Sequence, residues 1–255
     1  MIDRVHYSNA PITEAIIDLR IVQSWGLSIN DLAEIQEMLR DEYPYHEQEH
    51  MYSGQVFIEE VGKPPRTDEA YRLNGFQLTS RDKRRVFHAR LDGFTLAIGA
   101  PYDRWESFRD EARRLWDIYR SIAKPEGVSR IGMRYINQLD IAAYVPESTY
   151  VELRDFLNVY PETPASWMFN NFFMQLQIPQ EDLGGWLVVN EAPVRAPDKA
   201  DALLQLDFDL FREQFEEPWR ADDDTQVWDF LERLHTRKNE AFEASITDAT
   251  RRFIR

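Results

Sequence analysis

The chain contains no cysteine, and this absence excludes three kinds of site at once. Without a thiol there is no disulfide framework, no cysteine nucleophile and no zinc centre with thiolate ligands. The sequence also has no apolar run near the roughly 18 residues that a membrane-spanning helix needs. Its first residues, MIDRVHYSNAPITEA, lack the basic and apolar regions of a signal peptide. We therefore expect a cytoplasmic protein that does not enter a membrane.

A net positive charge is missing as well. Asp and Glu number 45 against 30 Lys and Arg, which gives a formal charge of −15. Such a chain repels a phosphate backbone at long range, so we expect no direct non-specific binding to nucleic acid. The five histidines lack the spacing of metal ligands, and the segment that holds His46 and His50 is predicted to be a surface loop.

The clearest element that is present is the alternating stretch from Gly127 to Ala142. Its apolar positions are Ile131, Met133, Tyr135, Leu139 and Ile141, and its polar positions are Arg130, Arg134, Gln138 and Asp140. A period of two predicts a strand with one face in the core and one charged face. Arg130 and Arg134 would share that charged face about 13 Å apart, at the usual rise per residue.

The rest of the chain can be divided into elements by the same patterns. We predict strands at 12–22, 55–61, 71–80, 85–91, 94–98, 166–178, 186–190 and 202–211, and helices at 29–42, 102–123, 149–159 and 224–253, the last as one helix or two abutting ones.

Local signals refine several boundaries. Ser28 with Asp31 resembles a capping box, and Asp103 with Glu106 predicts the cap of the second helix. Asp92-Gly93 predicts a type I′ hairpin turn. Asn74-Gly75 allows a second hairpin or a bulge in one long strand, and we favour the bulge. The segment 191–199, with two prolines, is predicted to be a loop.

These elements predict an α+β fold with an antiparallel-rich sheet and helices packed mainly on one face. Residues 1–126 follow the order β-α-β(3–4)-α and residues 127–255 the order β-α-β(3)-α, and we expect the two halves to form one compact unit. This order resembles the duplicated half-domains of the TATA-box-binding-protein fold. The resemblance implies that the two opening strands meet at a pseudo-dyad.

A second resemblance is carried by three motifs. They are Pro11-Ile12-x-Glu14, Tyr102-x-x-Trp105-x-x-Phe108 and Arg130-Ile131-Gly132-x-Arg134-Tyr135-Ile136-Asn137. Together they resemble a sporadically distributed bacterial protein family of about this length, which has no assigned activity. Its patchy distribution is typical of mobile and defence-linked genes, so the resemblance implies a role of that kind and no particular chemistry.

The charged residues of the two opening strands form the first candidate site. If these strands pair, Glu14 and Asp18 share a face with Arg130, Arg134 and Gln138. Opposite charges on neighbouring strands stabilise a sheet by about 0.2 to 1 kcal/mol per pair, so this face is in one interpretation a ladder of paired charges. In the other it is a groove that binds an anionic or carboxylate-bearing partner segment through arginine forks.

Asp207 and Asp209 form the second candidate site. Their i, i+2 spacing on a predicted strand places both carboxylates on one face, as a magnesium site requires. An Asp-x-Asp pair is also common on a solvated strand face in an acidic chain.

Two functions follow from these observations. The first is a non-enzymatic protein-interaction or regulatory module without a cofactor, of the antitoxin or anti-phage-defence kind, in which Arg130 and Arg134 direct binding of a protein partner. The alternative is a Mg-dependent enzyme or ligand-binding protein for phosphorylated or nucleotide substrates. In the alternative, Asp207 and Asp209 would hold Mg and the two arginines would hold phosphate.

Overall fold

The computed structural model describes residues 7–57, 66–144, 151–164, 167, 169, 171–195, 202–214, 216–220 and 224–255. The elements are β1 (Ile12–Val22), α1 (Ile29–Met38), β2 (Tyr45–Phe57), β3 (Arg66–Thr79), β4 (Arg85–Arg90), β5 (Gly93–Gly99), α2 (Trp105–Ala123), β6 (Gly127–Leu139), the 3-10 helix η1 (Ile141–Tyr144), α3 (Leu153–Phe156), β7 (Met174–Gln180), β8 (Gly185–Arg195), β9 (Ala202–Glu213), β10 (Trp219–Arg220), α4 (Thr225–Ser245) and α5 (Asp248–Phe253).

The strands form one antiparallel sheet with the order β2-β3-β4-β5-β1-β6-β9-β8-β7, and β10 pairs with β6. The predicted mixture of helices and a large antiparallel sheet is therefore confirmed. β1 and β6, the opening strands of the two predicted halves, are direct neighbours, with Ile17 opposite Met133 and Asp18 opposite Gly132. Residues from both halves thus contribute to the centre of the same sheet.

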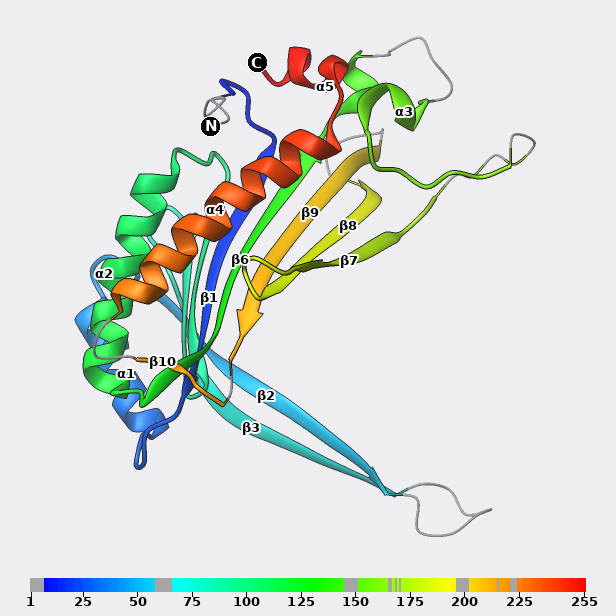
Figure 1. Ribbon diagram of the computed structural model, residues 1–255. Helices are drawn as coiled ribbons and strands as arrows, with labels where there is room; N and C mark the ends of the chain where they lie inside the picture. Colours follow the sequence, from blue (N-terminus) through cyan, green and yellow to red (C-terminus); the bar gives the residue numbers. More distant parts are fainter. Residues whose placement is uncertain are drawn as a thin grey trace.

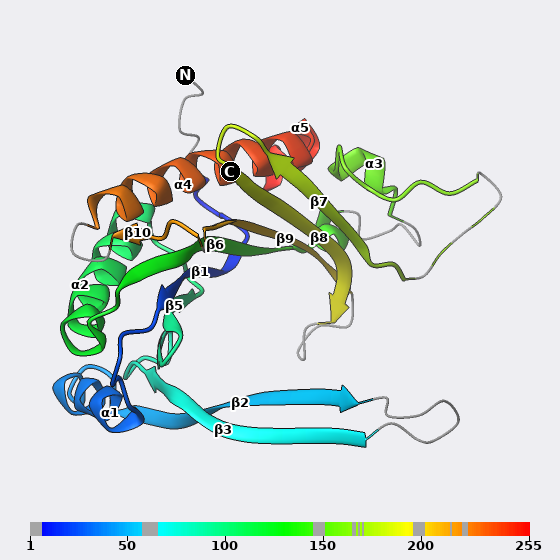
Figure 2. The same cartoon turned by 60° about the horizontal axis from the view of Figure 1, so that its bottom comes forward.

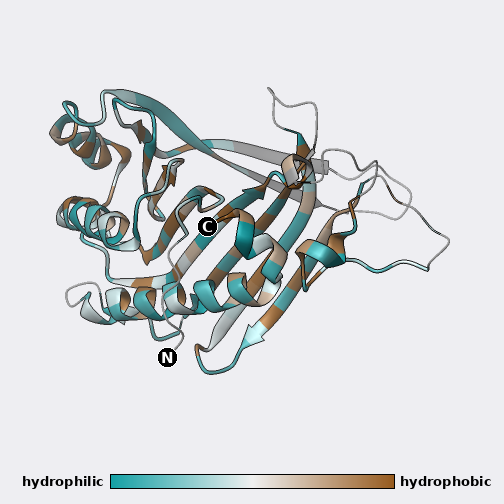
Figure 3. Cartoon of the chain, turned by 90° about the horizontal axis from the view of Figure 1, so that it is seen from above, coloured by the Kyte–Doolittle hydropathy of each residue, from teal (hydrophilic) through white to brown (hydrophobic). Residues whose placement is uncertain are grey.

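Three long helices lie along one side of this sheet (Figure 1). α2 contacts β5, α4 contacts β6 and β9, and α1 contacts α2 and β3. Hydrophilic and hydrophobic residues alternate along these helices, as expected for helices with one buried side (Figure 3).

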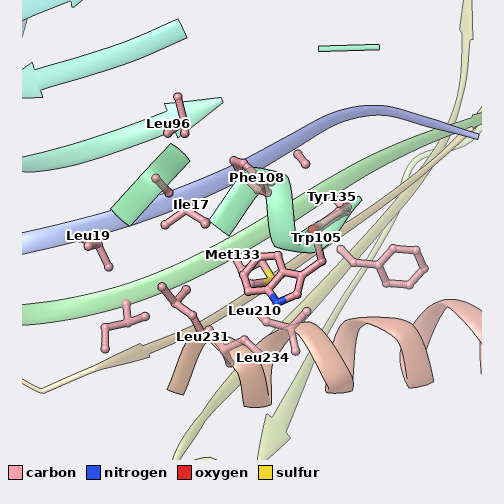
Figure 4. Close-up of a cluster of buried hydrophobic side chains, with 14 of the residues drawn as sticks. Ile17, Leu19, Leu96, Trp105, Phe108, Met133, Tyr135, Leu210, Leu231 and Leu234 are labelled. Atoms are coloured by element: carbon pink, nitrogen blue, oxygen red, sulfur yellow. The ribbon is translucent and has the colours of Figure 1, made fainter. Parts of the chain in front are cut away.

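The core fills the space between the helices and the sheet. Figure 4 shows strand residues meeting aromatic residues of α2 and leucines of α4. The apolar positions predicted for the stretch 127–142 are all buried: Ile131, Met133, Tyr135, Leu139 and Ile141 are at most 4% exposed. The first four confirm the face assignment of β6, but the predicted strand is too long, because β6 ends at Leu139 and Ile141 belongs to η1. The Tyr135 hydroxyl, deep in this core, is hydrogen-bonded to that of Tyr102 at 2.9 Å.

The predicted surface loop around His46 and His50 is wrong, because this stretch is the first part of β2. Tyr45 pairs with Thr79, and the ladder to β3 continues to Phe57. β2 is an outer strand with exposed side chains, so the usual apolar alternation is absent here. Figure 2 shows the β2–β3 hairpin standing away from the rest of the sheet. The residues 58–61 of the predicted strand 55–61 lie outside the described part of the chain.

The predicted bulge at Asn74-Gly75 is confirmed. Leu73 pairs with His50 and Gly75 pairs with Glu49, which leaves Asn74 as the extra residue of β3. β3 is accordingly one strand through this point.

The hairpin between β4 and β5 is confirmed, but its predicted type I′ turn is wrong. Arg90 pairs with Gly93, so the two loop residues are Leu91 and Asp92, and neither has a positive φ. Gly93 is needed for a close approach instead. A Cβ on it would lie 2.5 Å from the backbone oxygen of Leu19 on the neighbouring strand.

The predicted loop at 191–199 is also wrong in its first part. β8 continues to Arg195, which pairs with Ala202 of β9. Pro193 is tolerated because β7 ends its pairing with β8 at the pair of Met174 with Glu191, so Pro193 has a strand neighbour on one side. The residues 196–199 lie outside the described part.

The helix ends differ from the predictions in detail. The Ser28 backbone N–H donates to Asp31 Oδ2 at 2.8 Å, as a capping box requires, but α1 ends at Met38. Asp103 does not cap α2, since the N-cap residue is Arg104 and has no side-chain cap. The last helix is two helices, α4 and α5. Among the described residues, the predicted helix 149–159 corresponds to α3 and the predicted strand 166–178 to β7, while residues 149, 150, 166, 168 and 170 lie outside the described part.

Candidate functional site

The face of the sheet opposite the three long helices, here called the open face, carries a groove at its centre. The sheet curves around this face, so that β2–β3 and β7–β8 stand on either side of the central strands (Figure 2). The groove has a volume of about 650 Å³. It is lined by Ile16, Asp18, Arg20, Ile21, Arg90, Asp92, Thr95, Ser129, Arg130, Gly132, Met133, Arg134, Asp209 and Glu213. Four arginines meet four acids here, so the groove is neutral in a chain of charge −15.

The motif Arg-Ile-Gly-Met-Arg of β6 forms the floor of the groove. Arg130, Gly132 and Arg134 project to the same face because they are two residues apart. Arg130 extends over Gly132, and its Nη1 donates to Asp18 Oδ2 at 2.7 Å. A Cβ at position 132 would lie 2.5 Å from that Nη1 atom. The Arg130 guanidinium also covers the ring of Phe211 at 4.5 Å from its centroid, a cation–π contact.

Asp18 is the centre of the charge network. Arg90 Nη2 donates to Asp18 Oδ1 at 3.0 Å, and the Thr95 hydroxyl donates to the same oxygen at 2.6 Å. Arg20 Nε lies 3.3 Å from the other oxygen. Burial alone would raise the pKa of Asp18, but Arg20, Thr95 and the neighbouring arginines outweigh it and hold the pKa below its ordinary value. Asp18 is therefore a fixed negative charge at the floor of the groove.

Arg134 forms a bidentate fork with an acid at one side of the groove. Its Nε and Nη2 donate to the two oxygens of Asp207 at 2.8 and 2.6 Å. Asp207 is 1% exposed, and Asn190 Nδ2 donates to it at 3.0 Å. Arg134 itself is 42% exposed in its side chain, so one part of the guanidinium is buried against Asp207 and another part faces solvent.

Asp209 has a different environment from Asp207. Its nearest cation is Arg130, with Nη2 at 3.7 Å. Burial raises the pKa of Asp209, and the attraction of Arg130 and Arg134 offsets part of this increase. The described residues contain no group of three metal-ligating side chains. A Mg ion held by Asp207 and Asp209 would therefore compete with Arg134 for Asp207 and would take its remaining ligands from a substrate.

Glu14 and Gln138 lie farther along the same two strands and do not line the groove. Glu14 pairs in register with Ile136. Gln138 Nε2 lies 3.5 Å from the side-chain oxygen of Gln205. Of the five residues predicted for partner binding, the structure thus brings Asp18, Arg130 and Arg134 together.

Sequence analysis missed Arg90, which is 7% exposed, and Thr95. Both belong to the open face. Thr95 of β5 pairs with Asp18 and with His88 of β4, and Arg90 follows His88 by two residues, on the same side of β4. The sequence of β4 contains an alternating pattern that indicates a polar side, because His88 and Arg90 alternate with the buried Phe87 and Ala89. Without the strand order, that polar side could not be connected with Asp18.

Apolar side chains accompany the charged groove on strands farther from the centre of the sheet. Tyr45 and Met51 of β2 are 49% and 47% exposed, and Trp186 of β8 is 41% exposed. Trp186 pairs in register with Phe211, which lies under Arg130, so it belongs to the open face. This face thus offers paired charges at its centre and an exposed aromatic residue beside them.

Comparison with protein-family models and with curated proteins gives no match. The function is therefore inferred from the geometry of the open face. Among the described residues, no helix has the length and apolar character needed to cross a membrane.

Adding a methyl group at Gly132 is expected to displace Arg130 and lower the stability of the fold. Gly132→Ala places a Cβ 2.5 Å from Arg130 Nη1, so the guanidinium must move away from Asp18, and we expect a loss of about 1 kcal/mol in the free energy of unfolding. Gly99→Ala is the matched control, because its nearest atom would be 3.7 Å away. Denaturant unfolding measures both. Equal midpoints would show that Arg130 does not need the space above Gly132.

Proposed function

We propose that the protein is a non-enzymatic interaction module that binds a segment of a protein partner on its open face. One observation carries this proposal: the centre of the sheet is uncovered on that side and contains a groove of about 650 Å³ lined by four arginines and four acids. Antiparallel sheets do have solvated faces, so polarity alone would not indicate a site. The groove and the exposed aromatic residue beside it support the binding of a partner segment.

The charges of the groove indicate what kind of segment fits. All four of its arginines already have acidic partners, so a simple anion would have to displace these acids. A protein segment with both signs of charge can instead add to the network, for example with a carboxylate at the exposed side of Arg134 and a basic group near Glu213, which is 45% exposed in its side chain. Charge complementarity of this kind favours specificity and fixes the register of binding.

The strand order supports a further part of the proposal, namely that the fold is a duplicated one. β1 and β6 are central, β5 flanks β1, and β9 flanks β6. We propose that the two halves are related by a pseudo-dyad between β1 and β6, as in the fold that the sequence resembles. The groove then lies at the junction of the halves. The resemblance to a sporadically distributed family adds the proposal that the partner is the product of a defence-linked or toxin gene.

The proposal is tested by capturing partners from cells of the source organism with tagged protein. The double variant Arg130→Lys, Arg134→Lys keeps both positive charges but cannot form planar forks. We expect it to retain the fold and to lower the amount of captured partner by about tenfold or more, the effect of about 1.4 kcal/mol.

The matched control is Arg237→Lys. Arg237 of α4 also forms a fork, with Asp182 at 2.7 and 3.2 Å, but lies on a helix at the other side of the sheet. Capture should be unchanged in this variant. Equal capture by the wild type and the groove variant, with folding verified by circular dichroism, would contradict the proposed function.

A further inference from the structure

The sheet has two outer strands, β2 and β7, and their free edges differ in charge. The first residues of β2, Tyr45 to His50, include His46, Glu47 and Glu49. The sequence of β7, MQLQIPQ, has no charged side chain, and five of its seven residues are exposed. The second part of β2, Met51 to Phe57, is uncharged as well, so β7 differs in being uncharged along its whole length. Charged side chains normally protect such edges from pairing with another chain.

We propose that β7 pairs with β7 of a second copy of this chain, antiparallel about a two-fold axis. In such an interface each side chain meets itself or its symmetry counterpart. A charged residue there would face a like charge, whereas an uncharged strand has no such penalty. Each copy carries a charge of −15, so association is least opposed where the surface has no acid. The edge of β7 meets this condition along its whole length, whereas the edge of β2 meets it only from Met51 to Phe57.

The sequence of β7 also specifies a register. If Gln177 lies opposite Gln177 of the second copy, Leu176 lies opposite the second copy's Ile178, and the reverse pair forms on the other side of the axis. This register keeps Leu176 and Ile178 of both copies on one face and Gln175 and Gln177 on the other, and a shift by one residue would mix them. Leu176 and Ile178 are 37% and 38% exposed in the single chain, and these side chains would contact each other across the dimer. The two Gln177 amides can hydrogen-bond to each other.

Pro179 limits the extent of the pairing. It has no backbone N–H, so the ladder loses a donor where Pro179 meets Gln175 of the second copy. The pairing is therefore short, and we expect a dimer that dissociates on dilution. Pairing about a two-fold axis uses the same strand of both copies, which favours a closed dimer over a polymer.

Charge variants at the centre of the register provide the test. Sedimentation velocity of the full chain over a range of concentrations should show a monomer–dimer equilibrium. Gln177→Lys and Gln177→Glu each place like charges opposite each other, and each should raise the dissociation constant at least about tenfold. An equimolar mixture of the two variants should restore the dimer, because Lys then faces Glu. Gln48→Lys, at an exposed position of β2, should leave the equilibrium unchanged.

The mixture makes the test specific for this interface. A wild-type chain that stays monomeric at every concentration would overturn the proposal, as expected if the β7 edge recruits a strand of a different protein. A dimer with an unchanged dissociation constant in both Gln177 variants would place the interface elsewhere. Loss of the dimer without recovery in the mixture would contradict the register centred on Gln177. Circular dichroism of each variant verifies that the monomer remains folded.

Discussion

Replacing Glu191 by glutamine is expected to stabilise the protein by several kcal/mol at pH 8. Glu191 of β8 is fully buried, and neither carboxylate oxygen has a hydrogen-bond partner among the described residues. Burial raises the pKa of Glu191 from 4.5 to about 8. Each unit of this difference corresponds to about 1.4 kcal/mol, so the full effect is on the order of 5 kcal/mol.

The sign of the pH dependence follows from proton binding. Between pH 4.5 and 8 the folded chain keeps the proton on Glu191 while the unfolded chain releases it, so the wild type loses stability as the pH rises through this range. Glu191→Gln removes that loss, and its advantage should vanish below pH 4.5. Denaturant unfolding at pH 4.5, 6 and 8 measures the profile, with Glu181→Gln at an exposed turn position as the control. Parallel profiles for wild type and Glu191→Gln would show that the buried carboxyl finds a partner.

Removing Arg134 is expected to be much more damaging than removing a helix arginine with the same geometry. Arg134→Ala leaves the carboxylate of Asp207, with 2% of its side chain exposed, without its counter-ion. Leaving a buried charge without its counter-ion lowers the free energy of unfolding by about 3 to 5 kcal/mol. We expect a loss of about 3 kcal/mol here, because Arg134 is partly solvated. Arg237→Ala breaks a similar fork, but Asp182 is 63% exposed and can be hydrated, so its loss should be below about 1 kcal/mol.

A second substitution separates the lost charge from lost packing. The double variant Arg134→Ala, Asp207→Asn replaces the orphaned carboxylate by a neutral amide that can still contact Asn190. If the buried charge causes the destabilisation, this variant should recover most of the stability lost by Arg134→Ala. No recovery in denaturant unfolding would mean that the stem of Arg134 contributes mainly by packing against the sheet.

The alternation of β6 predicted the burial of its apolar side chains. Alternate residues of a strand point to opposite faces, and only one face of this sheet is covered by helices. The same rule placed Arg130 and Asp18 on one face before their distance was known. It could not predict that Asp207 would be almost fully buried, since its partners Arg134 and Asn190 come from two other strands. Burial of a polar residue on the open face depends on strand order and curvature, which local periodicity does not contain.

Some polar residues occupy buried positions that residue type alone does not predict. Lys238 lies four residues after Leu234 and four before Phe242, so the helical period alone places it on the buried side of α4. It is 7% exposed, with its Nζ 4.1 Å from the centre of the Tyr135 ring. Glu191 was assigned to a loop for a similar reason, because charged residues and prolines outweighed the strand neighbours that determine its burial.

The central pairing of β1 with β6 also has a consequence for synthesis of the chain. Asp18 and Arg130, hydrogen-bonded across these strands, are 112 residues apart. Ribosomes add about 5 to 20 residues per second, so β1 waits about 5 to 20 s for its second neighbour. Until then the middle of the future sheet is an unpaired edge that exposes Ile17 and Leu19 beside it. The interval in which this protein is most prone to misassociate is therefore set by translation, and slowing the ribosome before β6 would lengthen it.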